Sequence, residues 1–435
     1  MDMMTILSID IETKSSKDLS KCGVYAYCED KDFEILLFAY AFDNEDVEII
    51  DFTQNEKLPR RVLEALLDEK IIKSAFNANF ERICISAYLN LYLSPKSWRC
   101  SQVHVLSLGL PLSLDSVGEV LSVKNKKLKS GKNLIKFFNK GNSPKDYPDK
   151  WQEFKNYCIM DVKCEREIRE KLSKFPISHE EELLYELDQE INDRGIGVDM
   201  DFVKQAIICD ENHKNIIKEK LYKLTKLDNV NSISQMKKFL HERNVKTEKL
   251  DKKSVENIMK TCSEEICEIL SLRKLLSKTS VRKYESISKS VTKDERVHGL
   301  FQFYGASRTG RWSGRLVQVQ NLPQNRMENL EYARNLVKNK EHDKLSDLQE
   351  STPEVLSQLI RTAFVPKESH EFIVVDFSAI EARVLSWISN EKWRVEVFKT
   401  HGKIYEASAS EMFNIPIKDI NKDIKFAVMG CAVNG

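Results

Sequence analysis

The sequence lacks the features that mark membrane-bound, exported or zinc-binding proteins. Its longest apolar run, Ile35–Phe42, is far shorter than the roughly 20 residues that a membrane helix needs, and its first residues contain no basic stretch of the signal-peptide kind. The ten cysteines include no Cys-x-x-Cys pair, so neither a zinc site nor a disulfide framework is indicated. We therefore expect a cytoplasmic protein with reduced thiols and no membrane partner.

A strong net charge is also missing. The formal charge is +1, so any binding to nucleic acid must come from local basic patches. Lys124–Lys140 contains seven lysines and no acid, and Arg273–Lys293 contains seven basic residues and one acid. Such runs are usually solvated surface, but beside a nucleic-acid site they would contact phosphates in a salt-dependent way. At 435 residues with 41% hydrophobic content, the chain is long enough for two or three globular domains.

The N-terminal third has strand and helix patterns in the order βββαβα. That order predicts an α/β layer of the ribonuclease H-like type. The predicted strands are Thr5–Glu12, Phe33–Phe42, Val47–Phe52 and Ile71–Phe76, and the predicted helices are Leu58–Leu67 and Phe80–Leu91.

Two acids lie on one face of the first predicted strand. Leu7, Ile9 and Ile11 alternate with Asp10 and Glu12, so the two carboxylates are separated by two strand rises of roughly 3.3 Å each. Carboxylates that close repel each other unless a proton or a divalent cation is shared between them. The pair is either a solvated edge or part of a metal site.

Two later motifs favour the metal site. The segment Ser-Ala-Phe-Asn-Ala-Asn-Phe-Glu-Arg, with Asn77 and Glu81, and the segment Tyr-Cys-Ile-Met-Asp, with Tyr157 and Asp161, resemble the second and third motifs of DnaQ-like 3′→5′ exonucleases. Tyr157 and Asp161 are spaced i, i+4, which puts both on one helical face. The resemblance implies two-metal hydrolysis by Mg²⁺ or Mn²⁺, with metal ligands at Asp10, Glu12, Glu81 and Asp161, a water-orienting Tyr157 and DNA contact by Asn77. Glu81 departs from the family, which usually has Asp there, and this leaves the rate open.

The pattern of apolar residues in the middle of the chain predicts helices. Apolar residues recur at helical spacing from Glu180 to Ile191, and longer helices are predicted over 200–224 and 254–287 with a polar tip between them. A domain boundary near Phe175–Pro176 fits this change of pattern.

Near the C-terminus a strand pattern precedes an acid and a helix. Phe372–Val375 is apolar and β-branched, as in a buried strand, and Asp376 follows it. Ser378 and Glu381 have capping-box spacing at the start of the helix.

This last stretch, Asp-Phe-Ser-Ala-Ile-Glu-Ala-Arg, resembles the first palm motif of family A DNA polymerases, the bacterial DNA polymerase I class, and the chain as a whole is similar to the N-terminal part of a phage-like member. The resemblance implies that Asp376 binds the catalytic metals and that Glu381 lies beside the sugar of the incoming nucleotide. Thr-Gly-Arg-Trp-Ser-Gly, followed by Gln-Asn-Leu-Pro, is similar to another family motif, which implies duplex contact by Arg311, Gln320 and Asn321. The resemblance also makes Lys425 a nucleotide-binding residue and the helical middle a thumb.

The family's second palm carboxylate pair, a His-Asp-Glu strand turn, has no counterpart in these 435 residues. We therefore expect an α/β chain with a DnaQ-like exonuclease over 1–175, a helical thumb over 176–295 and a partial α+β palm over 296–435. The expected function is DNA replication, with hydrolysis of single-stranded DNA 3′ ends and binding of a primer-template duplex. Deoxynucleotides would be used only if a C-terminal polymerase fragment on another chain completes the site. The alternatives are a non-catalytic primer-template binding module, one half of a split polymerase, and an RNA 3′-trimming exonuclease. The expected location is the cytoplasm of a bacterial or phage-infected cell.

Overall fold

The computed structural model describes residues 5–126, 128, 131–276, 281–306, 309–348 and 350–420. The chain forms two compact units, residues 1–368 and residues 369–435. No helix in the described ranges is both long enough and apolar enough to cross a membrane.

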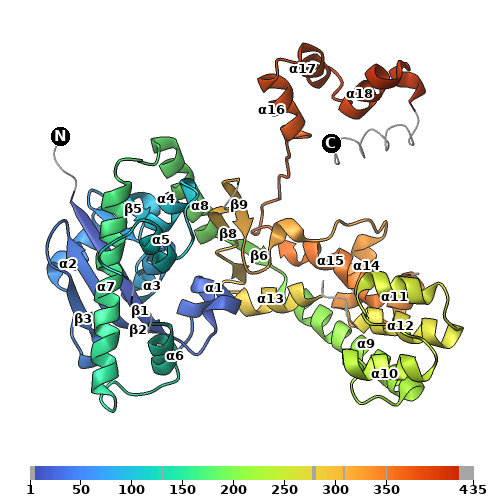
Figure 1. Cartoon of the computed structure of the whole chain (residues 1–435), viewed down its shortest axis with the longest axis horizontal. Coiled ribbons are helices and arrows are strands. Elements are labelled where there is room, and N and C mark those ends of the chain that lie inside the picture. Colours follow the sequence, from blue (N-terminus) through green and yellow to red (C-terminus); the bar gives the residue numbers. More distant parts are fainter. Residues whose placement is uncertain are drawn as a thin grey trace. The chain divides into compact units, whose positions relative to one another are not determined.

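The first unit opens with alternating strands and helices (Figure 1). In chain order these are β1 (Ile6–Lys14), α1 (Leu19–Cys28), β2 (Glu34–Phe42), β3 (Glu48–Asp51), α2 (Arg60–Leu67), β4 (Ile72–Ala75), α3 (Ala78–Leu89), β5 (Trp98–Cys100), α4 (Ser101–Ser107), α5 (Leu114–Val120), α6 (Gly131–Asn139) and α7 (Pro148–Leu172), with short 3₁₀ turns at Phe52–Gln54 and Pro95–Ser97. The predicted strands and helices are confirmed to within a few residues. The sequence pattern did not indicate α1, whose helical spacing is interrupted at Gly23, where φ is +76°.

The strands form one mixed sheet in the order β3-β2-β1-β4-β5. β1 is antiparallel to β2 and parallel to β4, with Asp10 opposite Ala39 and Ser8 opposite Ser74. Alternate residues of β2 enter two separate hydrophobic cores, one containing Phe38 and the other containing Leu37. The sheet is thus covered on both faces, which explains why β2 is the longest apolar run of the chain.

The rest of the first unit is mainly helical. Its elements are α8 (His179–Arg194), β6 (Ile196–Val198), α9 (Met200–Thr225), α10 (Ile233–Glu242), α11 (Lys252–Met259), α12 (Glu264–Leu276), α13 (Arg282–Ser290), β7 (Arg296–Val297), β8 (Phe301–Ala306), β9 (Arg311–Gly314), α14 (Leu330–Lys338), α15 (Thr352–Leu359) and β10 (Phe364–Val365), with 3₁₀ turns at Val319–Asn321, His342–Leu348 and Ile360–Ala363. β8 and β9 form a two-stranded hairpin, and β10, β6 and β7 form a small antiparallel sheet.

Two predictions for this helical region are wrong in detail. The predicted single helix over 254–287 is divided into α11, α12 and α13, and the polar tip contains α10. The first division falls at Thr261–Ser263, where the thiol of Cys267 donates a hydrogen bond back to the carbonyl of Met259, at a sulfur–oxygen distance of 3.2 Å. The helices α8 and α9 confirm the predicted helical patterns.

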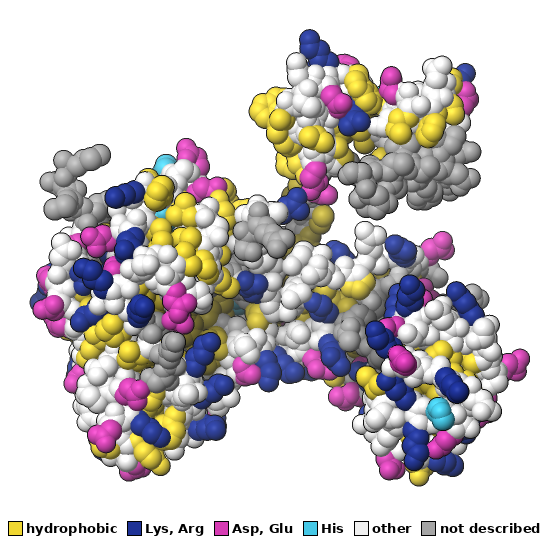
Figure 2. Space-filling view, viewed as in Figure 1, with side chains coloured by type: hydrophobic (Ala, Val, Ile, Leu, Met, Phe, Trp, Pro, Cys, Tyr) yellow, Lys and Arg dark blue, Asp and Glu magenta, His cyan; other side chains and the backbone are white. Residues whose placement is uncertain are grey.

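The second unit contains α16 (Ile380–Ile388), α17 (Lys392–Lys399), α18 (Ile404–Phe413) and a 3₁₀ turn at Ile417–Asp419. The predicted buried strand Phe372–Val375 is wrong, because these residues are extended but unpaired and Val374 is 88% exposed. A strand needs a neighbouring strand for its backbone hydrogen bonds, and residues 369–420 supply none. The predicted capping box is also wrong, since the helix begins after Ala379 and not after Ser378. Hydrophobic side chains remain visible on the surface of this unit (Figure 2).

Candidate functional site

The acids of β1 lie under helix α7. Leu7, Ile9 and Ile11 point into the core on one side of the sheet, which leaves Asp10 and Glu12 on the other side, where α7 packs against β1. The thiol of Cys158 on α7 donates a hydrogen bond to Asp10 Oδ2 over 3.3 Å. Glu12 is only 7% exposed and Asp10 is half-buried, so the pair is not a fully solvated edge.

Tyr157 stands among the carboxylates. Its ring is buried, and its hydroxyl is hydrogen-bonded to Asp161, one helical turn later. Burial raises the pKa of the Tyr157 phenol well above its usual range. Three carboxylates raise it further because their negative charge opposes a phenolate: Asp161, Glu12 and Asp10. The structure therefore brings together four of the predicted nuclease residues around a hydroxyl that stays protonated.

The fifth predicted nuclease residue, Glu81, belongs to helix α3 and not to β1 or α7. It lies in the first turn of α3 and is 5% exposed. Burial raises the pKa of the Cys100 thiol to about 11, and the Glu81 carboxylate adds to this shift. Glu81 is thus a buried acid that lies close to a buried cysteine at the end of β5.

Helix α6 covers the Tyr157 ring. A Cβ atom at Gly131, the first residue of α6, would lie 2.0 Å from Cε2 of Tyr157, so only glycine allows this approach. Leu134 and Phe138 bury the inner face of α6, and the Phe138 ring stacks on Phe154 with 5.3 Å between centroids. Gly131 was not among the predicted site residues, although a glycine inside a helical, lysine-rich segment is a usable signal of close packing.

The donor chemistry of this site suits a hard divalent cation. Carboxylate oxygens are the ligands that Mg²⁺ and Mn²⁺ prefer, and Asp10, Glu12 and Asp161 supply them near the Tyr157 hydroxyl. Within the ranges that the structure describes, however, no three His, Cys, Asp or Glu side chains are already grouped to hold an ion. The carboxylates would have to move closer together to coordinate one.

The predicted duplex-contacting residues lie on and beside the β8–β9 hairpin. Arg311 is exposed at the start of β9, and Gln320 and Asn321 are exposed in the 3₁₀ turn that follows. A Cβ at Gly314 would lie 1.9 Å from Oε1 of Gln320, so the turn folds back onto the end of β9. The structure thus places these three polar side chains on one surface feature. Asn77 lies elsewhere, exposed at the start of α3.

A buried carboxylate beneath the hairpin was missed. Trp312 Nε1 donates a hydrogen bond to Oδ1 of Asp188 over 2.7 Å, and Gln189 Nε2 donates to Oδ2 over 2.9 Å. Burial raises the pKa of Asp188 to about 6, despite these hydrogen bonds and one from Asn192. A buried acid beside a tryptophan of the Thr-Gly-Arg-Trp-Ser-Gly motif could not be found from the sequence, because α8 and β9 are far apart along the chain.

The described residues of the two basic runs are exposed for the most part, although two cations of the second run bind backbone carbonyls. The Arg273–Lys293 run is spread over α12 and α13, where Arg273 Nε donates to the carbonyl of Val230 and Lys283 Nζ donates to the carbonyl of Val317. These two cations therefore bind backbone and are not displayed outward. In the first run, Lys132 and Lys136 lie on the exposed face of α6.

The predicted palm residues lie in the second compact unit. Asp376 is exposed in the extended stretch before α16, and Glu381 is exposed in the first turn of α16. The predicted nucleotide-binding Lys425 lies outside the described residues.

Comparison with known proteins shows where the chain belongs. The model of DNA polymerase family A matches residues 204–427. The DNA polymerase of Bacillus phage SP02 is 52% identical over 432 residues, which cover 96% of this chain and 67% of that protein. DNA polymerase I of Treponema pallidum is 30% identical over 155 residues, covering 36% of this chain and 13% of that protein.

A solved structure has a similar fold. It is described as the POL domain of Pol1 from M. smegmatis in complex with DNA primer-template and dNTP. The TM-score is 0.63 with 17% identity, and the match covers 99% of this chain and 67% of that one. With the family model and the phage relative agreeing over most of the sequence, the chain belongs to DNA polymerase family A.

Proposed function

We propose that residues 1–175 form a 3′→5′ exonuclease that hydrolyses DNA 3′ ends, followed by a helical thumb over 176–295 and the first part of a polymerase palm over 296–435. The observation that carries the nuclease proposal is the position of the buried Glu12 and Asp161 and the half-buried Asp10 around the hydroxyl of the buried Tyr157. Buried acids that are grouped closely together are costly to a fold, and such groups mark functional sites.

The proposed chemistry assigns a task to each side chain. Mg²⁺ or Mn²⁺, held by Asp10, Glu12, Glu81 and Asp161, would supply an activated water and stabilise the leaving 3′ oxygen. Tyr157, whose pKa is raised by burial and by the neighbouring carboxylates, orients a water by accepting a hydrogen bond from it, since its own proton is donated to Asp161. Asp161 fixes the direction of that hydroxyl through their hydrogen bond.

The hairpin supports a second part of the proposal. Arg311, Gln320 and Asn321 are exposed together, and amides and guanidinium groups can contact minor-groove acceptors that every base pair presents. We infer that this surface holds a primer-template duplex, as in the complex described for the M. smegmatis protein. The metal-binding role of Asp376 and the nucleotide-binding roles of Glu381 and Lys425 belong to the same proposal. Synthesis would need a further carboxylate pair, for which a completing polypeptide is the proposed source.

The test of the nuclease is the double variant Asp10→Ala/Glu12→Ala. With Mg²⁺ or Mn²⁺, the parent should release mononucleotides from single-stranded DNA and the double variant should lose at least about three orders of magnitude in rate, measured by gel electrophoresis of end-labelled DNA. The matched control is Asp149→Ala/Glu153→Ala, which removes two exposed carboxylates from the outer surface of α7. Equal degradation by the parent and the Asp10/Glu12 variant would overturn the assignment.

One observation favours a non-catalytic alternative. The acids are not grouped as a ready metal site in the described ranges, and Glu81 stands where the exonuclease family has Asp. Under this alternative the chain binds the primer-template without cleaving it. The same assay separates the two functions, because a binding module would release no nucleotide yet retain affinity for the duplex.

A further inference from the structure

Two cysteines meet at the break between α11 and α12. Cys262 lies in the break, and Cys267 lies in the first turn of α12. Their sulfur atoms are 2.8 Å apart, and both thiols are free. The sulfurs of a disulfide bond are about 2.05 Å apart, so these two need to approach each other by less than about 1 Å to form one.

Hydrogen bonds hold both cysteines in this position. The amide of Cys262 donates to the carbonyl of Ile258 over 3.0 Å at the end of α11. The amide of Cys267 donates to the carbonyl of Ser263 over 2.9 Å at the start of α12. The Cys267 thiol donates its one hydrogen to the carbonyl of Met259, so the hydrogen that lies between the two sulfurs belongs to Cys262. The fold therefore brings the sulfurs together before any oxidation.

The pair is accessible from solvent. Both cysteines are partly exposed, and Cys262 packs at the edge of the hydrophobic cluster that α9, α10, α11 and α12 form. Burial and the neighbouring Cys267 thiol raise the pKa of Cys262 to about 11. The thiolate is the form that reacts with a disulfide, so Cys262 is a slow nucleophile near neutral pH and a faster one in mild alkali.

A second pair of thiols in the chain lacks these properties. The sulfurs of Cys28 on α1 and Cys84 on α3 are 3.5 Å apart, and Cys84 is fully buried. A disulfide there would require about 1.5 Å of movement between two helices in a close-packed core. Burial also raises the pKa of the Cys84 thiol well above its usual range. This pair should stay reduced under conditions that oxidise the first pair, which makes it an internal control.

Paired thiols can also serve as metal ligands. A structural zinc site needs four ligands, of which two cysteines supply only half. Among the residues that the structure describes, no third His, Cys, Asp or Glu stands with Cys262 and Cys267 in a group that could hold an ion. Oxidation is therefore the chemistry that this pair favours.

We propose that Cys262 and Cys267 form a reversible disulfide under oxidising conditions and that this bond ties α11 to α12. The oxidant is a small disulfide of the glutathione class. One cysteine thiolate attacks a sulfur of the oxidant, forms a mixed disulfide and releases one glutathione. The second cysteine thiolate then attacks the protein sulfur of the mixed disulfide and releases the other glutathione.

The exchange balances without a further reactant. The two protein thiols are oxidised to one disulfide, and the oxidant disulfide is reduced to two thiols, which take up the two protons. Disulfides that form in a reducing compartment are usually transient and redox-sensing, and excess reduced glutathione would reverse this one. The bond would replace a weak hydrogen bond with a covalent link across the break.

The first experiment maps the disulfide in the whole chain. The reduced protein is incubated with excess glutathione disulfide at about pH 8.5, the remaining thiols are blocked with N-ethylmaleimide, and the denatured product is cut after its glutamates. Glu264 and Glu265 lie between the two cysteines, so only a disulfide keeps the resulting peptides joined. Mass spectrometry should find them joined, and dithiothreitol should separate them. When half of the first pair is joined, less than about a tenth of the Cys28–Cys84 pair should be.

Two matched variants test which thiols are needed. In Cys267→Ser the serine hydroxyl can still donate to the Met259 carbonyl, but Cys262 should stop at the mixed disulfide with glutathione. Cys28→Ser removes one thiol of the buried pair and should leave the rate at which Cys262 and Cys267 join unchanged to within about twofold.

A second measurement tests the tie between the helices. Hydrogen exchange of peptides that cover α11 and the start of α12 should slow roughly threefold or more after oxidation, because the bond restricts local opening. Exchange in α14 should not change. An unchanged rate in α11 overturns the tie.

The disulfide itself is overturned by any of three results. The oxidised parent could contain no joined peptides, the Cys28–Cys84 disulfide could form with equal yield, or Cys28→Ser could abolish the joined peptides. The last two would mean that proximity and exposure do not select the pair. None of these measurements depends on cleavage or synthesis of DNA, so the disulfide and the proposed function are decided separately.

Discussion

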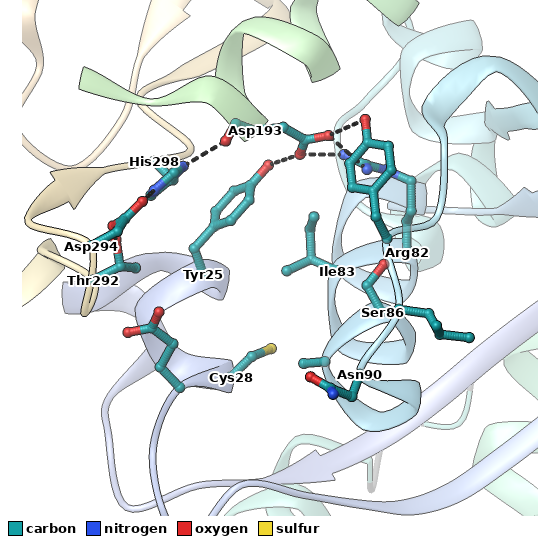
Figure 3. A pocket seen from close by; sticks show the side chains of 14 residues that line it. Tyr25, Cys28, Arg82, Ile83, Ser86, Asn90, Asp193, Thr292, Asp294 and His298 are labelled. Atoms are coloured by element: carbon teal, nitrogen blue, oxygen red, sulfur yellow. Dashed lines mark hydrogen bonds and ion pairs between the residues drawn. The ribbon is translucent and has the colours of Figure 1, made fainter. Parts of the chain in front are cut away.

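Arg82 and Asp193 form a bidentate ion pair that joins α3 to the end of α8. Arg82 Nη1 and Nη2 donate to the two Asp193 oxygens over 2.9 and 2.7 Å, and the Tyr25 hydroxyl donates to Oδ1 over 2.5 Å (Figure 3). The Arg82 side chain is 1% exposed. The pair thus ties the sheet layer to the helical part of the first unit.

Removal of the Asp193 carboxylate should be strongly destabilising. Asp193→Ala leaves a buried guanidinium without its partner, which typically costs about 3–5 kcal/mol in the free energy of unfolding. Urea unfolding, monitored by tryptophan fluorescence, measures this loss in the free energy of unfolding. The matched control is Glu45→Ala, since Arg61 and Glu45 form a pair with the same two distances but with side chains 60% and 49% exposed. The control should change stability by less than about 1 kcal/mol, and a similar loss in both variants would contradict this role for burial.

The Asp188→Asn variant should gain stability, relative to the parent, as pH rises. The folded chain holds the Asp188 proton up to about pH 6, whereas the unfolded chain releases it near the usual aspartate pKa of 3.8. The parent therefore loses stability as pH rises from about 4 to 6, by up to about 3 kcal/mol from this group. Asparagine does not titrate, so the stability of Asp188→Asn minus that of the parent should be larger at about pH 7 than at about pH 4.

Comparing this stability difference between the two pH values removes the contribution of any hydrogen bond that the substitution breaks, because that contribution is the same at both pH values. Unfolding by urea at the two pH values gives all four free energies. A difference that does not change with pH would mean that Asp188 is already ionised in the fold at the lower pH.

Gly131→Ala should strain the contact between α6 and Tyr157. The new methyl group would overlap the ring, and overpacking of a well-filled core costs about 1–3 kcal/mol. The cost should disappear in a Tyr157→Ala background, which makes room for the methyl group. Urea unfolding of the parent, the two single variants and the double variant gives the four free energies of this double-mutant cycle.

Gly118→Ala is the control for this cycle. A Cβ there would lie 3.1 Å from Cγ2 of Val123, a contact that a small shift relieves. It should cost less than Gly131→Ala, and its cost should be the same in the parent and in the Tyr157→Ala background. A Gly131→Ala penalty that persists without the ring would mean that the contact is not with Tyr157.

Residues 1–435 alone should not extend a primer. Asp376 stands in an exposed, unpaired stretch, and the sequence offers no second palm carboxylate pair. Loss of a metal-ligand pair should lower the rate of phosphoryl transfer by roughly three or more orders of magnitude. The assay uses a labelled primer-template with all four deoxynucleotides in the Asp10→Ala/Glu12→Ala background, so that degradation cannot hide synthesis. Processive extension would mean that a partner acid exists within these residues.

The local patterns of the sequence determined much of this protein. Alternation in β1 put Asp10 and Glu12 on one face, and the i, i+4 spacing put Tyr157 and Asp161 on one face of α7. These predictions succeeded because each depends only on the period of a strand or a helix.

Only the tertiary structure determined the contacts between residues that are far apart along the chain. The close approach of Gly131 to Tyr157, the Arg82–Asp193 ion pair and the enclosure of Asp188 by Trp312 each join residues that are far apart along the chain. The Phe372–Val375 stretch shows the reverse case. Its sequence favours a strand, but a strand forms only where a neighbouring strand satisfies its backbone, and residues 369–420 provide none. Propensity is a property of the segment, whereas pairing and burial are properties of what folds against it.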